Sequence, residues 1–249
     1  MKLSDWNELL NSINKKVIGI INSNNDSFSG DGVYKNKDDL TLLLTSAARN
    51  DIELIDVGCV STKPKFKDVN QEEEFNRLNF FLDNYEGNFK LSIDTMNKAI
   101  AKHALDNNFE ILNDVSGFKD PEMIELAVEK NTKIILVHNH PESSHIQEKM
   151  EFKNVVQEVK THLELKVNYL ISKGIQDNQI SVDPGLGFGK TMNDSRLLFK
   201  NLEDFCFGFP LVVGYSKKKF TENLNMTDSQ LYQHCIDSGA ALVRLHIPS

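Results

Sequence analysis

Polar side chains stand where the short apolar runs of this chain end, and among them are the carboxylates of Asp94 and Asp183 and the amide of Asn113. A carboxylate in a partly dry pocket can accept two parallel hydrogen bonds from an edge that offers N–H and NH₂ together. A pterin or a guanine ring presents such an edge. The same oxygens could instead ligate a hard cation such as Mg²⁺ or Ca²⁺. No His or Glu stands at similar ends in a clear ligand pattern, which disfavours a metal cage built by the protein alone.

A second group of side chains is cationic and lies toward the end of the chain. Arg244 and His246 are two residues apart in an apolar run, so they share one face of a strand. The run Lys217-Lys218-Lys219 follows another apolar run, so at least one ammonium group is expected over the same rim. Asn22, after the first run, would complete an anion pocket with Arg244 and His246. This pocket forms only if the first and last strands are neighbours, as in a closed barrel.

Three loops adjoin these side chains. The polar stretch 22–32 is either a flexible loop or a lid whose first residue offers an amide oxygen to a metal or a phosphate. The stretch 56–64 carries hydroxyls and a charge, and Asp56 is expected to be a structural acid that pairs near the rim. The glycine-rich stretch 183–190 partly mimics a phosphate-binding loop. Its leading Asp-Pro pair favours close approach of the backbone to a flat ligand over nucleotide binding.

Evenly spaced apolar runs, bounded by turn residues, predict eight buried strands. Stretches between them repeat apolar residues three and four apart, which predicts helices. This alternation of strands and helices predicts a parallel sheet. Eight strand–helix units favour a closed (β/α)₈ barrel, formed by residues 1–249 as a single domain. The active-site face of such a barrel lies at the carboxyl ends of its strands. The expected strands are Val17–Ile21, Glu53–Val57, Lys90–Ile93, Glu110–Leu112, Lys133–Val137, Ile180–Val182, Leu211–Val213 and Ala241–Leu245, and the clearest helices are Leu40–Arg49, Glu72–Asn84, Lys98–Asn107, Pro121–Glu129 and Phe152–Lys173.

The overall composition excludes several classes of protein. The formal charge of −8 disfavours general nucleic-acid binding, which needs a basic face. The three cysteines are odd in number and lack Cys-x-x-Cys spacing, which suits a reducing compartment. The amino-terminal stretch has an acid at Asp5 and no long apolar run, so neither a signal peptide nor a membrane span is expected. A cytoplasmic location is therefore expected.

Seven short motifs follow one another along nearly the whole chain: Ile18-Gly-Ile-Ile-Asn22 with Asp26-Ser-Phe28, Ile55-Asp-Val-Gly58 with Ser61-Thr62-x-Pro64, Ser92-Ile-Asp94-Thr95, Ile111-Leu-Asn113-Asp114-Val115, Asp183-Pro-Gly-x-Gly-Phe-Gly-Lys190, Ser216-x-Lys218 and Arg244-x-His246. In these motifs and their order the chain resembles the dihydropteroate synthase family. Their common order is a stronger signal than any one of them.

The resemblance implies a pterin-binding barrel of folate biosynthesis, a transferase that uses Mg²⁺. It would join 6-hydroxymethyl-7,8-dihydropterin pyrophosphate to p-aminobenzoate, giving 7,8-dihydropteroate and pyrophosphate. These small molecules are the implied partners, and a homodimer is left open. The implied catalytic residues are Asp94, Lys218 and Asn22, and Asn22 is the implied metal ligand. The implied binding residues are Asp94, Asn113, Asp183 and Lys218 for the pterin, Asn22, Arg244 and His246 for the pyrophosphate, and Phe28, Thr62, Lys63, Pro64, Phe188 and Lys219 on the p-aminobenzoate side.

Departures from the family pattern fall mainly on the p-aminobenzoate side. Lysine replaces the arginines expected at Lys63 and Lys217, and lysine cannot copy the planar stacking and paired contacts of a guanidinium. The serine expected after Lys218 is Lys219, the acid expected before Ser61 is Val60, and the usual Thr-Pro of the first loop is Asn24-Asn25.

The carboxyl-terminal end also departs from the family pattern. The sequence ends at Ser249, three residues past His246, so the eighth outer helix is expected to be absent. We hypothesise that the stretch Leu3–Ile13 covers the gap.

Two other functions stay open at this point. One is a pterin-binding homologue with an altered second substrate or with no independent activity, which the changed loops favour. The other is a methyltransferase barrel that uses methyl-tetrahydrofolate. Such barrels share the polar strand ends, but they need not keep the Ser216-x-Lys218 and Arg244-x-His246 pairs.

Overall fold

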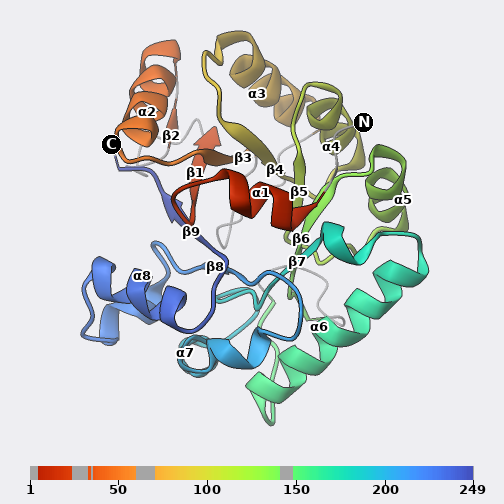
Figure 1. The fold of residues 1–249 in the computed structure, drawn as a ribbon, viewed down its shortest axis with the longest axis vertical. Helices are drawn as coiled ribbons and strands as arrows, with labels where there is room; N and C mark the ends of the chain where they lie inside the picture. Colours follow the sequence, from red (N-terminus) through yellow and green to blue (C-terminus); the bar gives the residue numbers. More distant parts are fainter. Residues whose placement is uncertain (1–4, 24–32, 35, 60–70, 141–147, 249) are drawn as a thin grey trace.

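Eight parallel strands form the wall of a barrel in the computed structural model, which describes residues 5–23, 33–34, 36–59, 71–140 and 148–248 (Figure 1). Neighbouring strands follow the order β7-β6-β5-β4-β3-β1-β9-β8, and a bridge between Val182 and Leu211 brings the two end strands together. A two-residue strand, β2 (Val33–Tyr34), pairs with β1 outside this path. The barrel strands are β1 (Val17–Ser23), β3 (Leu54–Gly58), β4 (Lys90–Asp94), β5 (Ile111–Asp114), β6 (Lys133–Val137), β7 (Ile180–Asp183), β8 (Val212–Gly214) and β9 (Leu242–His246).

Helices α2 to α8 each follow a barrel strand in the chain, and α1 precedes the first strand. Side-chain caps fix where several begin: Asp120 accepts from Glu122 N before α5, and reciprocal capping boxes start α7 and α8. No helix in the described residues is long and apolar enough to cross a membrane. The helices are α1 (Trp6–Ser12), α2 (Lys37–Arg49), α3 (Gln71–Asn84), α4 (Lys98–Asp106), α5 (Pro121–Lys130), α6 (Val155–Ser172), α7 (Met192–Lys200) and α8 (Asp228–Asp237), with 3₁₀ turns η1 (Asp177–Gln179), η2 (Leu202–Phe205) and η3 (Lys219–Asn223).

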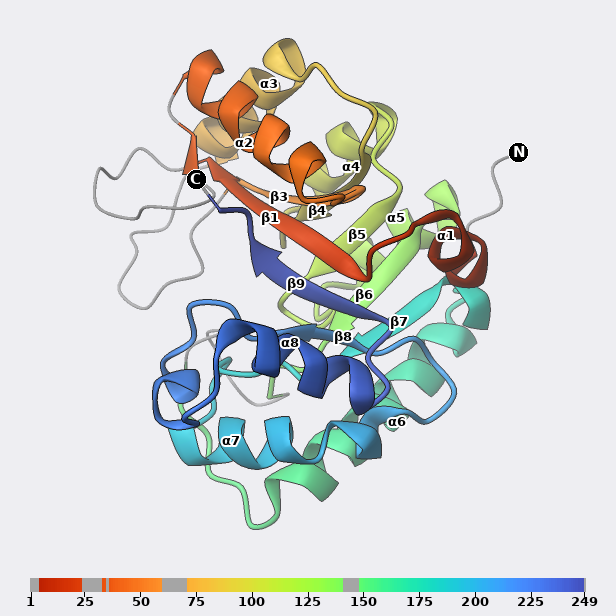
Figure 2. The same cartoon turned by 60° about the vertical axis from the view of Figure 1, so that its left-hand side comes forward.

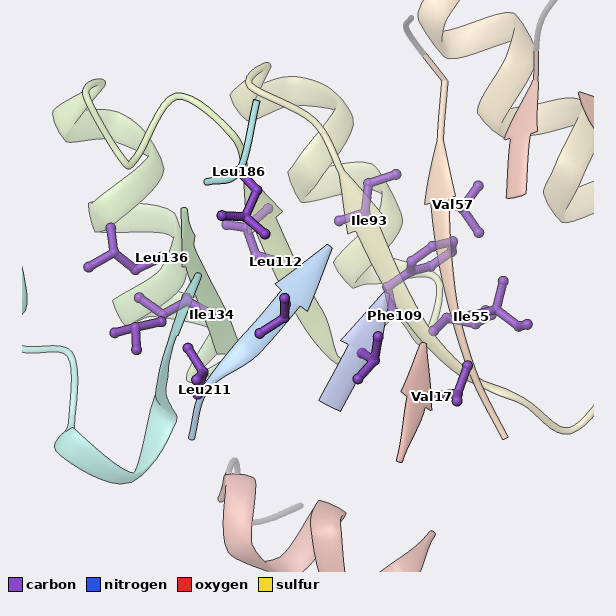
Figure 3. Close-up of a cluster of buried hydrophobic side chains, with 14 of the residues drawn as sticks. Val17, Ile55, Val57, Ile93, Phe109, Leu112, Ile134, Leu136, Leu186 and Leu211 are labelled. Carbon is purple, nitrogen blue, oxygen red and sulfur yellow. The ribbon is translucent and has the colours of Figure 1, made fainter. Parts of the chain in front are cut away.

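Most strand side chains contribute to one of two apolar layers. Those that point outward pack under the helices, as the close-up of Val17, Ile55, Ile93 and Leu112 illustrates (Figure 3). Those that point inward form a separate buried cluster inside the barrel, with members from β1, β3, β5, β6, β8 and β9. Because strand side chains alternate between faces, the apolar positions of each strand divide between these two layers, while β4 and β7 place polar residues such as Ser92 and Ser181 on the inner face.

Helix α1 closes the amino-terminal end of the barrel (Figures 1 and 2). Trp6 and Leu9 belong to the inner apolar cluster, and the Trp6 indole donates to the carbonyl oxygens of Ile134 (3.2 Å) and Gln179 (2.9 Å). The hypothesis that this stretch replaces the eighth outer helix is therefore wrong. The apolar side chains of α1 pack against the inner cluster at the end of the barrel and not beside β9.

Beyond β9 the described chain continues only through Ile247 and Pro248, and no helix follows. Ile247 packs over Gly19, where an added Cβ would lie 2.9 Å from its side chain. Ser46 of α2 donates to the Pro248 carbonyl oxygen at 2.7 Å. These two residues thus cover part of the outer surface of β1.

Replacing Trp6 with alanine is expected to lower the free energy of unfolding by about 3–5 kcal/mol, as for other buried aromatic residues. The side chain is 1% exposed, and its indole N–H donates a hydrogen bond to a backbone carbonyl oxygen inside the barrel end. Urea unfolding followed by circular dichroism measures the change. Because Trp6 lies at the end of the barrel remote from the polar strand ends, ligand affinity of the remaining folded protein should stay within twofold, and a large loss of affinity would contradict this assignment.

Candidate active site

The carboxyl-terminal ends of the strands carry a ring of polar side chains above the inner apolar layer. Leu54, Ile111 and Leu242 belong to that layer, and the residues two positions later on the same strands are polar. Strand register brings neighbouring ends level, since Gly58 pairs with Asp94 and Asp94 with Asn113. The sequence-predicted residues that the barrel gathers in this way are Asn22, Asp56, Asp94, Asn113, Asp183, Arg244 and His246.

Arg244 lies at the centre of the ring and bridges two carboxylates. Its Nη2 donates to Asp56 Oδ2 at 2.5 Å and to Asp94 Oδ2 at 3.1 Å. Asn113 Nδ2 donates to the same Asp56 oxygen at 3.0 Å. The side chains of Arg244 and Asp56 are only 7% and 1% exposed, so their ion pair is buried, and together with Asp94 and Asn113 it links four strands. Asp56 acts as the structural acid that its position suggested.

Lys218 and Asp183 form the opposite side of the ring. An atom placed as Cβ on Gly214 would lie 3.8 Å from Asp183 Oδ2, 3.8 Å from Lys218 Nζ and 3.7 Å from Arg244 Cβ. The three side chains therefore converge above one glycine at the end of β8. The Lys218 ammonium also lies over the Phe188 ring, 4.7 Å from its centroid, in a cation–π contact.

The expected anion pocket has its members on adjacent strands. A Cβ atom added to Gly58 would lie 2.5 Å from Asn22 Oδ1, which is too close for two non-bonded atoms. Glycine at this position therefore leaves space for the Asn22 amide. His246 Nδ1 lies 3.0 Å from the Ser216 hydroxyl oxygen, which also accepts from His246 N at 3.3 Å. Strand β9, which carries Arg244 and His246, pairs with β1, which carries Asn22, as closure of the barrel requires.

Several buried polar atoms of this ring make no hydrogen bond. Buried donors and acceptors in native proteins are nearly all paired, and exceptions mark sites that meet a ligand or water. Such atoms therefore make the barrel mouth suited to a polar ring with both donors and acceptors. Those at the ring are Asp56 Oδ1, Ser92 Oγ, Asn113 Oδ1 and Arg244 Nε.

Burial shifts the ionisation of the central groups in opposite directions. The pKa of Asp94 is raised by burial and by the charge of Asp56, against the opposing effect of Arg244. Burial lowers the pKa of Lys218 to about 8, against the opposing charge of Asp183. Burial also raises the pKa of Asp183, while the Lys218 charge opposes this. An acid and a base with perturbed pKa values in one concave site are typical of active sites.

The p-aminobenzoate side of the predicted site is only partly described. Phe188 is buried at the barrel mouth, and Lys219 is exposed at the start of η3. The other four residues expected there, Phe28, Thr62, Lys63 and Pro64, lie outside the described residues.

Two supporting contacts were not foreseen from the sequence. Buried Glu74 of α3 accepts from the Thr95 hydroxyl at 2.6 Å, and that hydroxyl oxygen accepts from Asn97 N at 3.0 Å. This fixes the turn directly after Asp94. Ser216 was noted only as part of a motif, and its contact with His246 depends on a strand pairing 30 residues apart.

Comparison with known proteins agrees with this geometry. The model of the pterin binding enzyme family matches residues 18–246, which span every barrel strand except the first residue of β1. The chain belongs to the pterin-binding enzyme family.

Within that family its relatives are dihydropteroate synthases. The enzyme of Haemophilus influenzae is 27% identical over 99% of this chain and 94% of its own length. That of Streptococcus pyogenes serotype M1 is 31% identical, over 94% of this chain and 90% of its own.

Solved structures of dihydropteroate synthases share the fold. The Xanthomonas albilineans enzyme with 4-aminobenzoic acid superposes with a TM-score of 0.81 at 26% identity, covering 93% of this chain and 87% of its own. The Burkholderia cenocepacia enzyme complexed with 7,8-dihydropteroate has a TM-score of 0.80 at 26% identity, covering 94% and 86%.

Proposed function

We propose that this barrel catalyses the dihydropteroate synthase reaction at the carboxyl ends of its strands. The observation that carries the proposal is the convergence of Asp94, Asn113, Asp183, Lys218 and Arg244 around one buried mouth with unpaired polar atoms. The relatives bearing that name support the choice of reaction. The substrates are then 6-hydroxymethyl-7,8-dihydropterin pyrophosphate and p-aminobenzoate.

The pterin ring is bound by the acids and the amide. A carboxylate oxygen pair accepts from the amidine-like edge of the ring, while Asn113 and Lys218 can donate to its ring nitrogen and carbonyl acceptors. Cleavage of the C–O bond to pyrophosphate leaves a cationic pterin methylene, and Asp94 stabilises the positive charge that develops. Burial and the charge of Asp56 raise the pKa of Asp94, and a positive charge that develops beside it favours the ionised carboxylate.

The leaving pyrophosphate is bound on the Asn22 side of the mouth. Arg244 and His246 share one face of β9, and Asn22 lies on the neighbouring strand β1. The cationic donors of β9 and the amide of β1 can therefore contact the same anion. A magnesium ion fits this place, because Mg²⁺ takes oxygen ligands, keeps several waters and is usually held by one protein oxygen with substrate phosphates. Asn22 would supply that oxygen, and bound Mg²⁺ would neutralise the leaving anion. Among the described residues no cluster of three or more His, Cys, Asp or Glu side chains could hold a metal.

The amine of p-aminobenzoate then attacks the methylene from the side bordered by Phe188. Pyrophosphate has by then left with the electron pair of the broken C–O bond, and as the new C–N bond forms the arylamine gives up one proton to solvent. The exposed Lys219 and the loop residues Phe28, Thr62, Lys63 and Pro64 are proposed to border this second site.

Activity is expected to fall above pH 8, because Lys218 loses its charge there. Its pKa, lowered by burial to about 8, means that the ammonium donor is present below this pH and lost as pH rises through it. The value of kcat/KM for the pterin substrate should then fall about tenfold per pH unit on the alkaline side. In Lys218→Arg, which stays charged, the alkaline limb should disappear even if the rate is lower. An unchanged limb in this variant would contradict the assignment.

Magnesium dependence tests the proposed role of Asn22. Calorimetric titration of the dihydropterin pyrophosphate, with and without Mg²⁺, should show tighter binding with the metal in the unmodified protein. In Asn22→Ala this difference should shrink by about tenfold, with affinity for 6-hydroxymethylpterin, which lacks the pyrophosphate, unchanged. Exposed Asn107→Ala is the matched control. Equal Mg²⁺ dependence in Asn22→Ala and the control would remove Asn22 from the metal site.

A pterin-binding homologue with another second substrate is the alternative that the changed loop residues favour. Pterin pyrophosphate would then bind and be cleaved, while p-aminobenzoate would neither bind nor be joined. A methyl-tetrahydrofolate methyltransferase is disfavoured, because Ser216, Lys218, Arg244 and His246 are all retained at the mouth.

A further inference from the structure

Lys190 follows the glycine-rich loop after β7, and its ammonium group is fully enclosed by protein acceptors. Nζ lies 2.9 Å from the Gly185 carbonyl oxygen, 3.0 Å from that of Phe188, and 3.0 Å from His138 Nδ1, with the His138 carbonyl oxygen at 3.4 Å. An ammonium has three protons, and these acceptors use all of them. The side chain therefore points into the protein and not at a phosphate, which rules out the nucleotide-loop interpretation of this segment.

The loop that Lys190 closes is held in an unusual backbone shape. Gly185, Gly187 and Gly189 have φ values of 67, 82 and 62°, which glycine tolerates at little cost. Its carbonyl groups at Gly185 and Phe188 turn inward, toward the lysine. The Gly185 carbonyl oxygen also accepts from Phe188 N at 3.1 Å, so Lys190 is its second donor. Lys190 donates as well to the buried Phe188 carbonyl oxygen, which would be costly to leave unpaired, and so ties the two ends of this turn together.

The same loop forms the wall against which Lys218 packs. A Cβ on Gly187 would lie 3.4 Å from Lys218 Cδ, and the Phe188 ring lies below the Lys218 ammonium at 4.7 Å. Phe188 is also part of the inner apolar cluster, so its ring has a defined place. Movement of the loop would therefore displace the Lys218 side chain relative to Asp183.

We propose that Lys190 is a positioning residue that sets the place of Lys218 by holding the Phe188 loop through the Gly185 and Phe188 carbonyl groups. The consequence for turnover rests on the proposed function of Lys218, whereas the positional effect does not. Lys190 itself touches neither substrate. Its action on Lys218 is transmitted by the Phe188 ring and the Gly187 backbone.

Nuclear magnetic resonance of protein labelled with ¹³C-lysine tests the positional effect without any substrate. The Phe188 ring should shift the ε-methylene signal of Lys218 upfield, and that signal is identified by its loss in Lys218→Arg. Phe188→Leu should remove the upfield shift. Lys190→Met should remove most of it as well, because the loop no longer holds the ring in place.

Lys166→Met is the matched control. Lys166 is also partly buried and donates to a loop carbonyl, that of Phe118, at 2.8 Å. Its hydrogen bond to Phe118 and its contact with the Tyr169 ring lie away from Phe188 and Lys218, so this variant should keep the upfield signal. A Lys190→Met protein that retains the full upfield shift would overturn the proposal. If Lys190→Met does not fold, Lys190→Gln replaces it, and a full upfield shift in that variant would equally overturn the proposal.

A kinetic double-mutant cycle tests the consequence for turnover. Displacement of a binding group by about 1 Å can lower rates about 100-fold, so Lys190→Met should lower kcat/KM for the pterin substrate by about 10- to 100-fold. The double variant with Phe188→Leu should be no slower than the slower single variant, because both act through one ring. Losses that multiply would show that Lys190 acts elsewhere. If the unmodified protein forms no dihydropteroate, the proposed function fails while the spectroscopic result still decides the role of Lys190.

Discussion

Asp94→Asn is expected to lower kcat for dihydropteroate formation about 10³-fold. Loss of one group that stabilises transition-state charge typically costs about 10²–10³ in rate, and Asp94 also accepts from Arg244 at 3.1 Å. Asparagine has the same shape, but it offers a neutral oxygen and an NH₂ where a carboxylate meets the cationic methylene. Initial rates at saturating concentrations of both substrates measure the effect.

Two further measurements separate a catalytic role of Asp94 from simple binding. A residue that only binds the pterin would raise KM and the calorimetric Kd while kcat stayed unchanged. The proposed mechanism requires kcat itself to fall. Asp106→Asn is the control, because Asp106 is a surface acid paired with Lys102 and Lys130. An unchanged kcat in Asp94→Asn would contradict the proposed stabilisation of the methylene cation.

Arg244→Met is expected to abolish turnover and also to destabilise the ligand-free protein by about 3–5 kcal/mol. Removing one partner of a buried pair leaves uncompensated charge, which carries a cost of about this size. Arg244 is the shared partner of Asp56 and Asp94, and its side chain is 7% exposed. Urea unfolding of each variant measures the stability directly.

The destabilisation by Arg244→Met should depend on pH in a defined direction. Burial and Asp56 already raise the pKa of Asp94, and Arg244 opposes them, so its removal raises this pKa further. When the pKa of a carboxyl group is higher in the folded than in the unfolded protein, ionisation of that group lowers the free energy of unfolding. This destabilisation disappears as the pH falls through the folded pKa, because the group is then protonated. The deficit should therefore be greater at pH 8 than at pH 5.

A second substitution provides the matched test of the ion pair. In the Asp56→Asn/Arg244→Met variant one buried charge is gone together with its partner, so most of the stability should return while turnover stays absent. The double-mutant cycle gives the coupling energy of the two side chains. Equal stability of Arg244→Met and the unmodified protein would show that the bridge makes no net contribution.

The barrel was predictable from the sequence because local patterns determine its strands. Each of the eight expected strands is present within two residues of its predicted bounds, and each contributes side chains to the buried apolar layer under the helices. Helices α7 and α8 were not among the predicted elements. The capping pairs Thr191–Asp194 and Thr227–Gln230 were their readable signals, because a Thr followed three residues later by an acid or amide marks a helix start.

Long-range partners were not predictable in the same way. The sequence placed Arg244 near a rim, but its pairing with Asp56 spans 188 residues and depends on barrel closure. The stretch 183–190 partly mimicked a phosphate-binding loop, and although its Asp-Pro start disfavoured that interpretation, spacing alone could not show that the Lys190 ammonium points into the protein. The position of Trp6 inside the barrel end was not predicted, because it depends on the carbonyl groups of Ile134 in β6 and Gln179 in η1.

The most direct test of the central proposal is an assay that follows both products at once. Purified protein is incubated with Mg²⁺, the dihydropterin pyrophosphate and p-aminobenzoate, and pyrophosphate and 7,8-dihydropteroate are measured together. The proposal predicts that both form in equal amounts and that both disappear in Lys218→Ala. Pyrophosphate without dihydropteroate, or neither product despite tight pterin binding, would contradict it and identify a homologue that needs another second substrate or another subunit.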